Sequence, residues 1–293
     1  MQNVQGILLV VLAMAGFTLE DLFIKKLSVS LPTGQILIIL GVFSSAIFAG
    51  IAIAKGQSLV ARAAWGRAAL IRACSEAMAA MSFASALALV DISTVAAVFQ
   101  AMPLVITMGA AIFLGEHVGW RRWSAIGVGF AGVLCIIRPG FSSFEPATLL
   151  VIVAVFSVAL RDLITRKIDA SVSAYVVSFQ GFGSLVFAGA ILLLFTDKPT
   201  VAPDVAQSAM FAGAVLFGTM GYWGIVTAMR VADASVVAPY RYSRLVFSIL
   251  VGTIFLNERP DVATLFGASL IIGSGLYTFL RERRLAAHPI EVA

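Results

Sequence analysis

Residues 91–116 read DISTVAAVFQAMPLVITMGAAIFLGE, and residues 233–258 read DASVVAPYRYSRLVFSILVGTIFLNE. Aligned without gaps, both stretches begin with Asp, carry Ser two residues later, contain Ile-Phe-Leu near the end and finish with Glu. An apolar composition can match Ile, Phe and Leu by chance, but it does not place Asp, Ser and Glu in register at both ends. The chain therefore contains an internal repeat.

A second sequence match between the copies lies nearer the start of each one. Asp21-Leu22 and Asp162-Leu163 are each followed by a basic pair, Lys25-Lys26 and Arg166-Lys167. Recurrence in both copies indicates a scaffold or gate element that each copy needs. We therefore interpret Asp21 with Lys25, and Asp162 with Arg166, as pairs four residues apart on one helix face.

The composition indicates that the chain is folded within a lipid bilayer. The 293 residues are 60% hydrophobic and only 12% charged, with a mean hydropathy of +1.01. Soluble domains carry roughly a quarter charged residues. The net charge of +5 could indicate a nucleic-acid partner, but the basic residues separate apolar runs and form no stripe on one face. We expect lipid and a small-molecule substrate as partners, and no nucleic acid.

Apolar segments long enough to cross a bilayer, which takes roughly 20 residues, recur along the whole chain. Ten are predicted: 5–26, 33–54, 67–90, 92–115, 122–138, 147–167, 172–195, 206–231, 234–256 and 262–281. We expect an all-α membrane protein of about ten transmembrane helices, with a first five-helix repeat at 5–139 and a second at 146–282. Because five is odd, the second copy enters the membrane upside down. Inverted repeats are typical of secondary transporters, which bind substrate near the midplane between the copies.

The basic residues of the loops predict the orientation. With the N-terminus inside, about eleven Lys and Arg residues fall on the cytoplasmic side and about five on the outer side. Cytoplasmic loops of membrane proteins carry the excess of positive charge. We therefore expect a multi-pass protein of a bacterial inner membrane with both termini in the cytoplasm.

At these residues the chain resembles the drug/metabolite transporter superfamily, in particular its EamA branch. The likeness is carried by the helix ends IFLGEHVGW at 112–120 and IFLNERPDV at 254–262, and by the tandem five-helix repeat. The patterns ALVDISTVA at 88–96 and AMRVADASVVAP at 228–239 add to it. The resemblance implies a ten-helix exporter of amino acids, other metabolites or drugs. An aromatic amino acid exporter of the YddG type is the closest characterised kind that it suggests.

Charged residues inside the membrane are costly, so each is a candidate functional residue. At 1.5 Å per residue, Glu76, Arg241 and Arg244 lie roughly 12–16 Å from the cytoplasmic ends of their helices, close to the midplane. Arg72 lies roughly 7 Å deep, and Glu20 precedes Asp21 toward the outer end.

The repeat register sets these charges apart. It aligns Arg241 with Phe99 and Arg244 with Met102, and it aligns Glu76 with Gly218. Charges that break the repeat suit the site of an asymmetric ligand. The alternative stays open that Arg72 and Glu76, four residues apart, neutralise each other and that the two arginines are structural or snorkel.

Several less specific residues flank the same level. Those proposed to line the site are Tyr222, Trp223, Tyr240, Tyr242, Phe99 and Gln100. Core or lipid contact is the alternative for each. Four acids, Asp91, Glu116, Asp233 and Glu258, lie at helix ends, where capping or loop anchoring is the expected role.

The sequence gives no support to an enzyme, a cofactor or a metal site. Gly127, Gly129 and Gly132 fit a dinucleotide-binding spacing, but they lie in a predicted membrane helix and follow no strand. These glycines, with Gly181, Gly183, Gly267, Gly273 and Gly275, are better explained by close helix packing. The two cysteines and two histidines form no metal-binding spacing.

These observations favour a secondary transporter that exports small metabolites, amino acids foremost, by alternating access at a midplane cavity. Arg241 and Arg244 would bind a carboxylate, and Glu76, or else Glu20 or Asp21, would bind an amine or carry a proton. A first alternative is a transporter of phosphate-bearing or other organic anions. A second is a membrane scaffold or receptor without transport. The oligomeric state stays open, a monomer included.

The predicted orientation can be tested by cysteine labelling. After replacement of Cys74 and Cys135, single cysteines at Gln57 and Arg283 should be shielded from an impermeant thiol reagent added to whole cells. A cysteine at Lys198 should react. The opposite pattern would invert the orientation, and a mixed one would contradict the ten-helix count.

Overall fold

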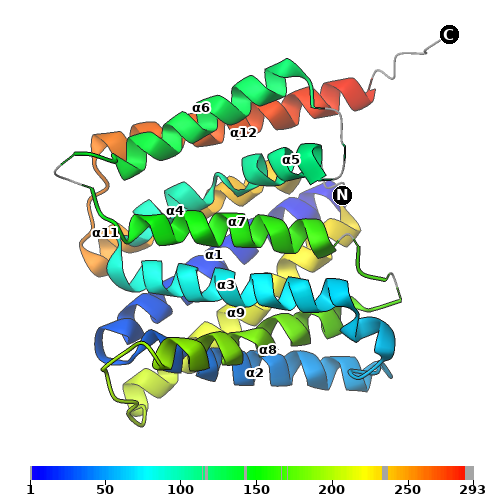
Figure 1. Cartoon of the computed structure of the whole chain (residues 1–293), viewed down its shortest axis with the longest axis vertical. Coiled ribbons are helices and arrows are strands. Elements are labelled where there is room, and N and C mark those ends of the chain that lie inside the picture. The colour runs from blue at the N-terminus through cyan, green and yellow to red at the C-terminus, as the bar shows by residue number, and fades with distance from the viewer. Residues whose placement is uncertain are drawn as a thin grey trace.

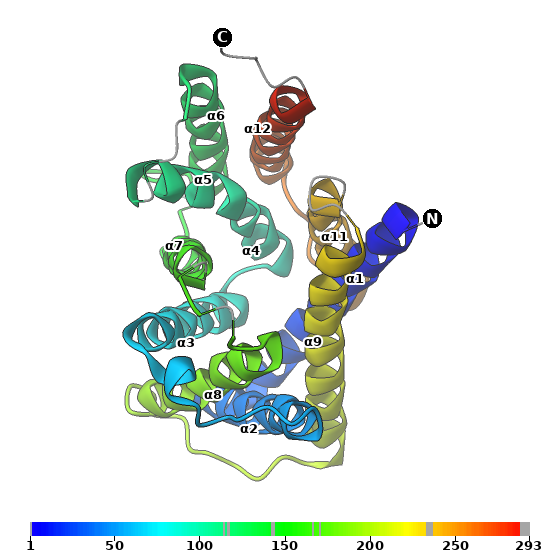
Figure 2. The same cartoon turned by 90° about the vertical axis from the view of Figure 1, so that its right-hand side faces the viewer.

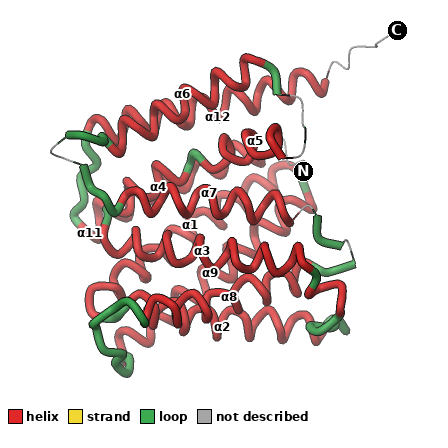
Figure 3. The backbone as a smooth tube through the Cα atoms, in the orientation of Figure 1, coloured by secondary structure: helices red, strands yellow, loops and turns green. Residues whose placement is uncertain are grey.

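The computed structural model describes residues 2–113, 115, 118–141, 144–165, 167–169, 171–232 and 237–287, and within them it contains helices and no strand (Figures 1 and 3). The long helices are α1 (Gln2–Ser30), α2 (Thr33–Ala54), α3 (Arg67–Leu89), α4 (Ile92–Phe99), α5 (Met102–Phe113), α6 (Trp120–Ile137), α7 (Thr148–Thr165), α8 (Ala174–Leu193), α9 (Val205–Val231), α11 (Ser243–Leu256) and α12 (Val262–Ala287). Two 3₁₀ helices, η1 (Arg62–Trp65) and η2 (Ala238–Tyr242), accompany them.

The predicted membrane-spanning segments are recovered as helices. Among the described residues, nine spans are long and apolar enough to cross a membrane, with α4 and α5 together forming one of them. The remaining predicted segment, 234–256, is divided into η2 and α11, and its residues 234–236 lie outside the described part. The prediction of an all-α membrane protein with two inverted five-helix repeats is confirmed.

The helices of one repeat pack against those of the other in a two-fold pattern. The first helix of each repeat contacts the third helix of the other, since α1 packs on α9 and α3 packs on α7. The second, fourth and fifth helices each contact their own counterpart, in the pairs α2 with α8, α4 with α11 and α6 with α12. Figure 2 shows α3 and α7 on one side of the molecule and α1 and α9 on the other. This pairing is what a two-fold axis between inverted repeats produces.

Glycines bring two of these helix pairs into backbone contact. A Cβ on Gly34 of α2 would lie 2.5 Å from the carbonyl oxygen of Gly189 in α8. A Cβ on Gly132 of α6 would lie 2.6 Å from the carbonyl oxygen of Gly267 in α12. Small residues allow such close approach, as in other membrane helix pairs.

The prediction of close packing is therefore confirmed for Gly132 and Gly267, and Gly129 and Gly275 are also tightly enclosed. It is wrong for Gly127, Gly183 and Gly273, where a Cβ would meet no atom within 4 Å, and Gly181 makes only ordinary contact. The difference arises because the position of a glycine around the helix axis determines whether it faces a neighbouring helix. The presence of glycine in a segment does not show which side of the helix it occupies.

At one end of the molecule, a charged contact joins the two repeats. The carboxylate of Glu258, at the end of α11, accepts hydrogen bonds from the backbone N–H groups of Ile92 (3.0 Å) and Ser93 (3.4 Å) at the start of α4. It lies 3.6 Å from Nζ of Lys25 in α1. Lys25 also donates to the carbonyl oxygens of Leu87 and Val90 at the end of α3. Acid groups stabilise helix N-termini and cations stabilise C-termini, so each charge is well placed.

This contact corrects one prediction and extends another. Lys25 does not pair with Asp21, because its side chain reaches the end of α3 instead. Glu258 does cap a helix, but the helix belongs to the other repeat. Asp91 precedes α4 without a capping hydrogen bond from its side chain, and Glu116 and Asp233 lie outside the described residues.

In both repeats, the residue before the final Glu of the quoted stretch has a left-handed backbone conformation. Gly115 has φ of 68° and Asn257 has φ of 56°. Asn257 follows α11, and its backbone N–H bonds the carbonyl oxygen of Gly252. Glycine and asparagine adopt this conformation more readily than other residues, so each can end a helix here.

The glycine contacts predict a specific sensitivity. Gly189→Ala should lower the free energy of unfolding by about 1–3 kcal/mol, because the added methyl group would collide with the backbone of α2. Gly183→Ala on the same helix should be neutral or slightly stabilising, because its Cβ would meet nothing. Thermal denaturation of the detergent-solubilised variants measures both. Equal effects at the two positions would contradict the packing of α2 on α8.

Candidate functional site

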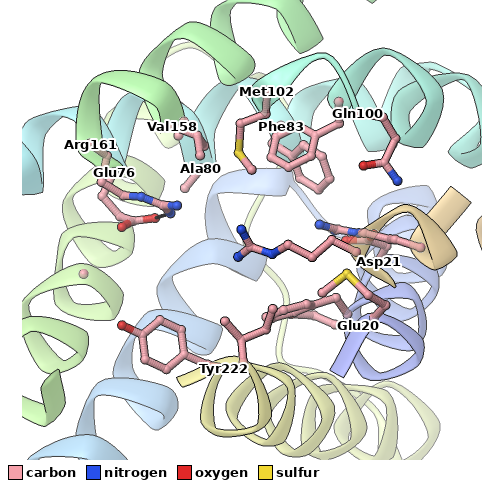
Figure 4. A pocket seen from close by; sticks show the side chains of 18 of the residues that line it. Glu20, Asp21, Glu76, Ala80, Phe83, Gln100, Met102, Val158, Arg161 and Tyr222 are labelled. Carbon is pink, nitrogen blue, oxygen red and sulfur yellow. Dashed lines mark hydrogen bonds and ion pairs between the residues drawn. The ribbon is translucent and has the colours of Figure 1, made fainter. Parts of the chain in front are cut away.

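A cavity of about 540 Å³ lies between the two repeats. Its wall comes from α1, α2, α3, α7, α8, α9, α11, α12 and η2, and from α4 and α5 around their junction. The charged residues that line it are Glu20, Asp21, Arg72, Glu76, Arg161, Arg241 and Arg244. Figure 4 shows Glu76 and Arg161 facing each other on one side, with Glu20 and Asp21 on the opposite side.

On the first side, two arginines neutralise one carboxylate. Nη1 of Arg161 in α7 lies 2.9 Å from Oε1 of Glu76 in α3. Nη2 of Arg72, one turn earlier in α3, lies 3.3 Å from Oε2 of Glu76. Nε of Arg72 donates to the Thr165 hydroxyl at 3.0 Å. The alternative in which Arg72 and Glu76 pair along one helix is thus observed. Both carboxylate oxygens of Glu76 contact an arginine.

Arg161 also binds the carboxylate that follows it in the chain. Its Nη2 lies 2.8 Å from Oδ1 of Asp162. Asp162 is not part of the cavity wall, and its predicted partner Arg166 lies outside the described residues. Asp162 therefore supports the orientation of Arg161 from behind the wall.

On the opposite side, Arg244 and Asp21 form an ion pair between the repeats. Nη2 of Arg244 in α11 lies 2.7 Å from Oδ2 of Asp21 in α1. The guanidinium also lies 5.4–5.5 Å from the ring centroids of Phe17, Phe83 and Phe99, within the range of cation–π attraction. Asp21 thus pairs with Arg244 of the other repeat, in place of Lys25.

Two charged groups of the cavity are left without a partner. Arg241 and Glu20 both line the cavity, and neither forms a hydrogen bond or ion pair with any residue of the described part. The amide nitrogen of Gln100 is buried and has no hydrogen-bond partner among the described residues either. These groups are the ones available to a ligand.

The predicted aromatic residues divide between the cavity and the outer surface. Phe99, Tyr222 and Tyr242 line the cavity. Trp223 is 52% exposed and Tyr240 is 41% exposed, and neither belongs to the wall. Successive residues of an α-helix point about 100° apart, because one turn takes about 3.6 residues. The neighbour of an inward Tyr222 therefore faces outward, and the alternative of lipid contact describes Trp223 better.

Sequence reasoning did not single out Arg161. The signal was present in the repeat: aligning Asp21 with Asp162 places Arg161 opposite Glu20. The two residues are a charge reversal at one register position, and both line the cavity.

Both fourth helices of the repeats are interrupted beside the cavity. In the first repeat, α4 ends at Phe99 and α5 begins at Met102. In the second, η2 ends at Tyr242 and α11 begins at Ser243. The interruptions match in register, and residues at both line the cavity. Discontinuous helices at corresponding positions of two repeats mark the binding site in several transporter folds.

Comparison with known proteins agrees with this geometry. The model of the EamA-like transporter family matches residues 4–138 and 146–280. An S-adenosylmethionine uptake transporter of Rickettsia prowazekii is 30% identical, over 69% of this chain and 68% of that protein. A riboflavin transporter of Vibrio cholerae is 30% identical over 60% and 58%. A pseudopaline exporter of Pseudomonas aeruginosa is 24% identical over 91% and 93%.

One solved crystal structure shares the fold with a TM-score of 0.61. It is 20% identical in sequence, and the match covers 94% of this chain and 98% of that one.

The Arg244–Asp21 pair predicts non-additive mutations. Asp21→Ala and Arg244→Ala should each lower the free energy of unfolding by about 3 kcal/mol, because each leaves one buried charge uncompensated. The double variant should lose much less than the sum. Thermal denaturation measures the cycle, with exposed Glu145→Ala as the control. Additive losses would mean that the two side chains do not interact.

Proposed function

Because the chain belongs to the EamA-like transporter family, and is thus a multi-pass secondary transporter, we propose that it exports amino acids or metabolites that carry an amino acid group. The resemblance seen in the quoted helix ends is confirmed by the family match over both repeats. In this proposal the substrate binds in the cavity between the repeats, and the protein exposes the cavity alternately to the two sides of a bacterial inner membrane.

The observation that carries the proposal is the state of Arg241. The other three arginines of the cavity wall donate to Glu76 or Asp21. Arg241 lines the same cavity without a partner in the described part. The Asp162 carboxylate acts on Arg241 electrostatically but is bound by Arg161, and an arginine without a bonded acid inside a membrane protein is costly. A substrate carboxylate would compensate it, and the planar guanidinium can bind both carboxylate oxygens at once.

The pairing of Arg244 changes the role proposed for it from the sequence. Its guanidinium already donates to Asp21 and is surrounded by three aromatic rings. We therefore assign carboxylate binding to Arg241, and we assign Arg244 to the support of the cavity wall. Glu76, held by two arginines, is likewise a supporting group.

The relatives support a metabolite of this kind without selecting one. S-Adenosylmethionine, named for the Rickettsia relatives, contains an α-amino acid group, whereas riboflavin, named for the Vibrio relative, does not. The relatives include uptake proteins and an exporter. Export is the direction that we propose, in line with the relative that aligns over 91% of this chain.

A second candidate substrate class is supported by the charge count. Four arginines and three acids line the cavity, an excess of one positive charge when all are ionised. A phosphate-bearing or other organic anion would also suit this excess. Such a substrate would leave Glu20 without a partner, which makes it the weaker candidate.

The assignment of Arg241 is tested by flux into proteoliposomes. We expect Arg241→Ala to lower the flux of methionine, phenylalanine or S-adenosylmethionine roughly 10-fold or more, the size of a lost charged hydrogen bond. Arg241→Lys should recover part of the flux, because it keeps the charge and loses the bidentate geometry. Size-exclusion profiles check that each variant is folded.

Arg62→Ala, at an exposed arginine of η1, is the matched control and should transport normally. Wild-type flux in Arg241→Ala would contradict the assignment. Competition by glucose phosphate and by none of the amino acids would favour the organic-anion class instead.

A further inference from the structure

Comparing the two repeats residue by residue isolates one feature of the cavity. Glu20 precedes the matched aspartate of the first repeat, and Arg161 precedes that of the second. The register of the stretches 91–116 and 233–258, which differs from this one by a single residue, aligns Glu76 in the third helix of the first repeat with Gly218 in the third helix of the second. Two symmetry-related contacts can therefore be compared: Arg161 with Glu76, and Glu20 with Gly218.

The structure forms both contacts, because α7 packs on α3 and α1 packs on α9. In the first contact, Arg161 and Glu76 make an ion pair with a separation of 2.9 Å. In the second, the Glu20 carboxylate lies directly on the glycine: a Cβ at Gly218 would be 2.5 Å from Oε1 and 2.8 Å from Oε2. One half of the cavity is thus neutralised by the protein, and the other half holds a carboxylate where the partner side chain is missing.

No cation of the described chain is directed at Glu20. The charged groups that act on it are its neighbour Asp21 and Arg244. The Arg244 guanidinium donates to Asp21 at 2.7 Å, so that charge is already used. Glu20 faces the cavity with Phe17 and Ile24, which lie three residues before it and four residues after it on the same helix face.

We infer that Glu20, whose carboxylate occupies the place of the side chain missing at Gly218, forms the subsite for a cationic group of the substrate, a primary ammonium or another organic cation. The substrate then supplies to Glu20 the positive charge that Arg161 supplies to Glu76. A metal ion is a poor fit, because hard cations need several oxygen ligands, and the one adjacent carboxylate, that of Asp21, is bound by Arg244. This inference rests on the proposed function, in which Arg241 binds the carboxylate of the same molecule.

Matched ligands test the subsite. The probes are L-methionine, L-phenylalanine and L-tryptophan, each with a counterpart that lacks only the ammonium group: methylthiobutanoate, phenylpropanoate and indolepropanoate. Binding to purified full-length protein in nanodiscs is measured by calorimetry. We expect the wild type to bind at least one amino acid roughly 10- to 100-fold more tightly than its deaminated counterpart, as a charged hydrogen bond implies.

The Glu20→Gln variant should lose most of this preference while binding the deaminated acid as the wild type does. Arg241→Ala should weaken the amino acid and the deaminated acid alike. Glu145→Gln, at an exposed position, is the control and should keep the wild-type preference. If Glu20→Gln does not fold, Glu20→Asp, which keeps the charge on a shorter side chain, should reduce the preference in part.

The outcomes separate this inference from the proposed function. Amino acid binding that depends on Arg241, with full preference retained in the Glu20 variants, would overturn the cation subsite and leave the proposed function standing. Wild-type protein that binds none of the three amino acids would contradict the proposed function, and the subsite with it.

Discussion

Arg244 and Asp21 neutralise each other in the interior of the molecule, and they come from different repeats. An ionised side chain within a bilayer must be paired or exposed to water, because lipid offers it neither charge nor hydrogen bonds. Arg161 and Glu76 meet the same requirement across the cavity, again between repeats. Each pair holds a helix of one repeat at a fixed place on the other. These ion pairs hold the shape of the cavity without a ligand. Arg241 and Glu20 are the charged residues of the wall that form no ion pair within the described part of the chain.

The sequence alone predicted most of the fold. Long apolar segments define the helices, and the register of Asp, Ser and Glu defines the repeat, because both depend on residue type and spacing. Depth along each helix also brought Glu76, Arg241 and Arg244 to one level, and all three line the cavity. What the sequence could not predict was the pairing of these charges. Pairing depends on which helices pack together and on the face that each residue occupies. For this reason Arg244 was not distinguished from Arg241, Lys25 was paired with the wrong residue, Trp223 was placed inside, and Arg161 was missed.

The departures from symmetry are as informative as the symmetry. Gly115 and Asn257 end equivalent helices in the same left-handed conformation, so this part of the repeat serves the fold. Glu76 and Gly218 occupy equivalent positions with opposite consequences, since one completes an ion pair and the other lets a carboxylate pack directly against the helix.

The glycine contacts of α2 with α8 and of α6 with α12 lie at opposite ends of the long axis of the molecule (Figure 1). At these points backbone touches backbone, with no side chain between them that could change its rotamer. Close-packed groups without such freedom transmit displacement instead of absorbing it. Each pair contains one helix from each repeat, so a shift of α2 carries α8 with it. The two repeats are thus mechanically coupled at both ends of the molecule, and the coupled helices α2, α8 and α12 also contribute to the wall of the cavity.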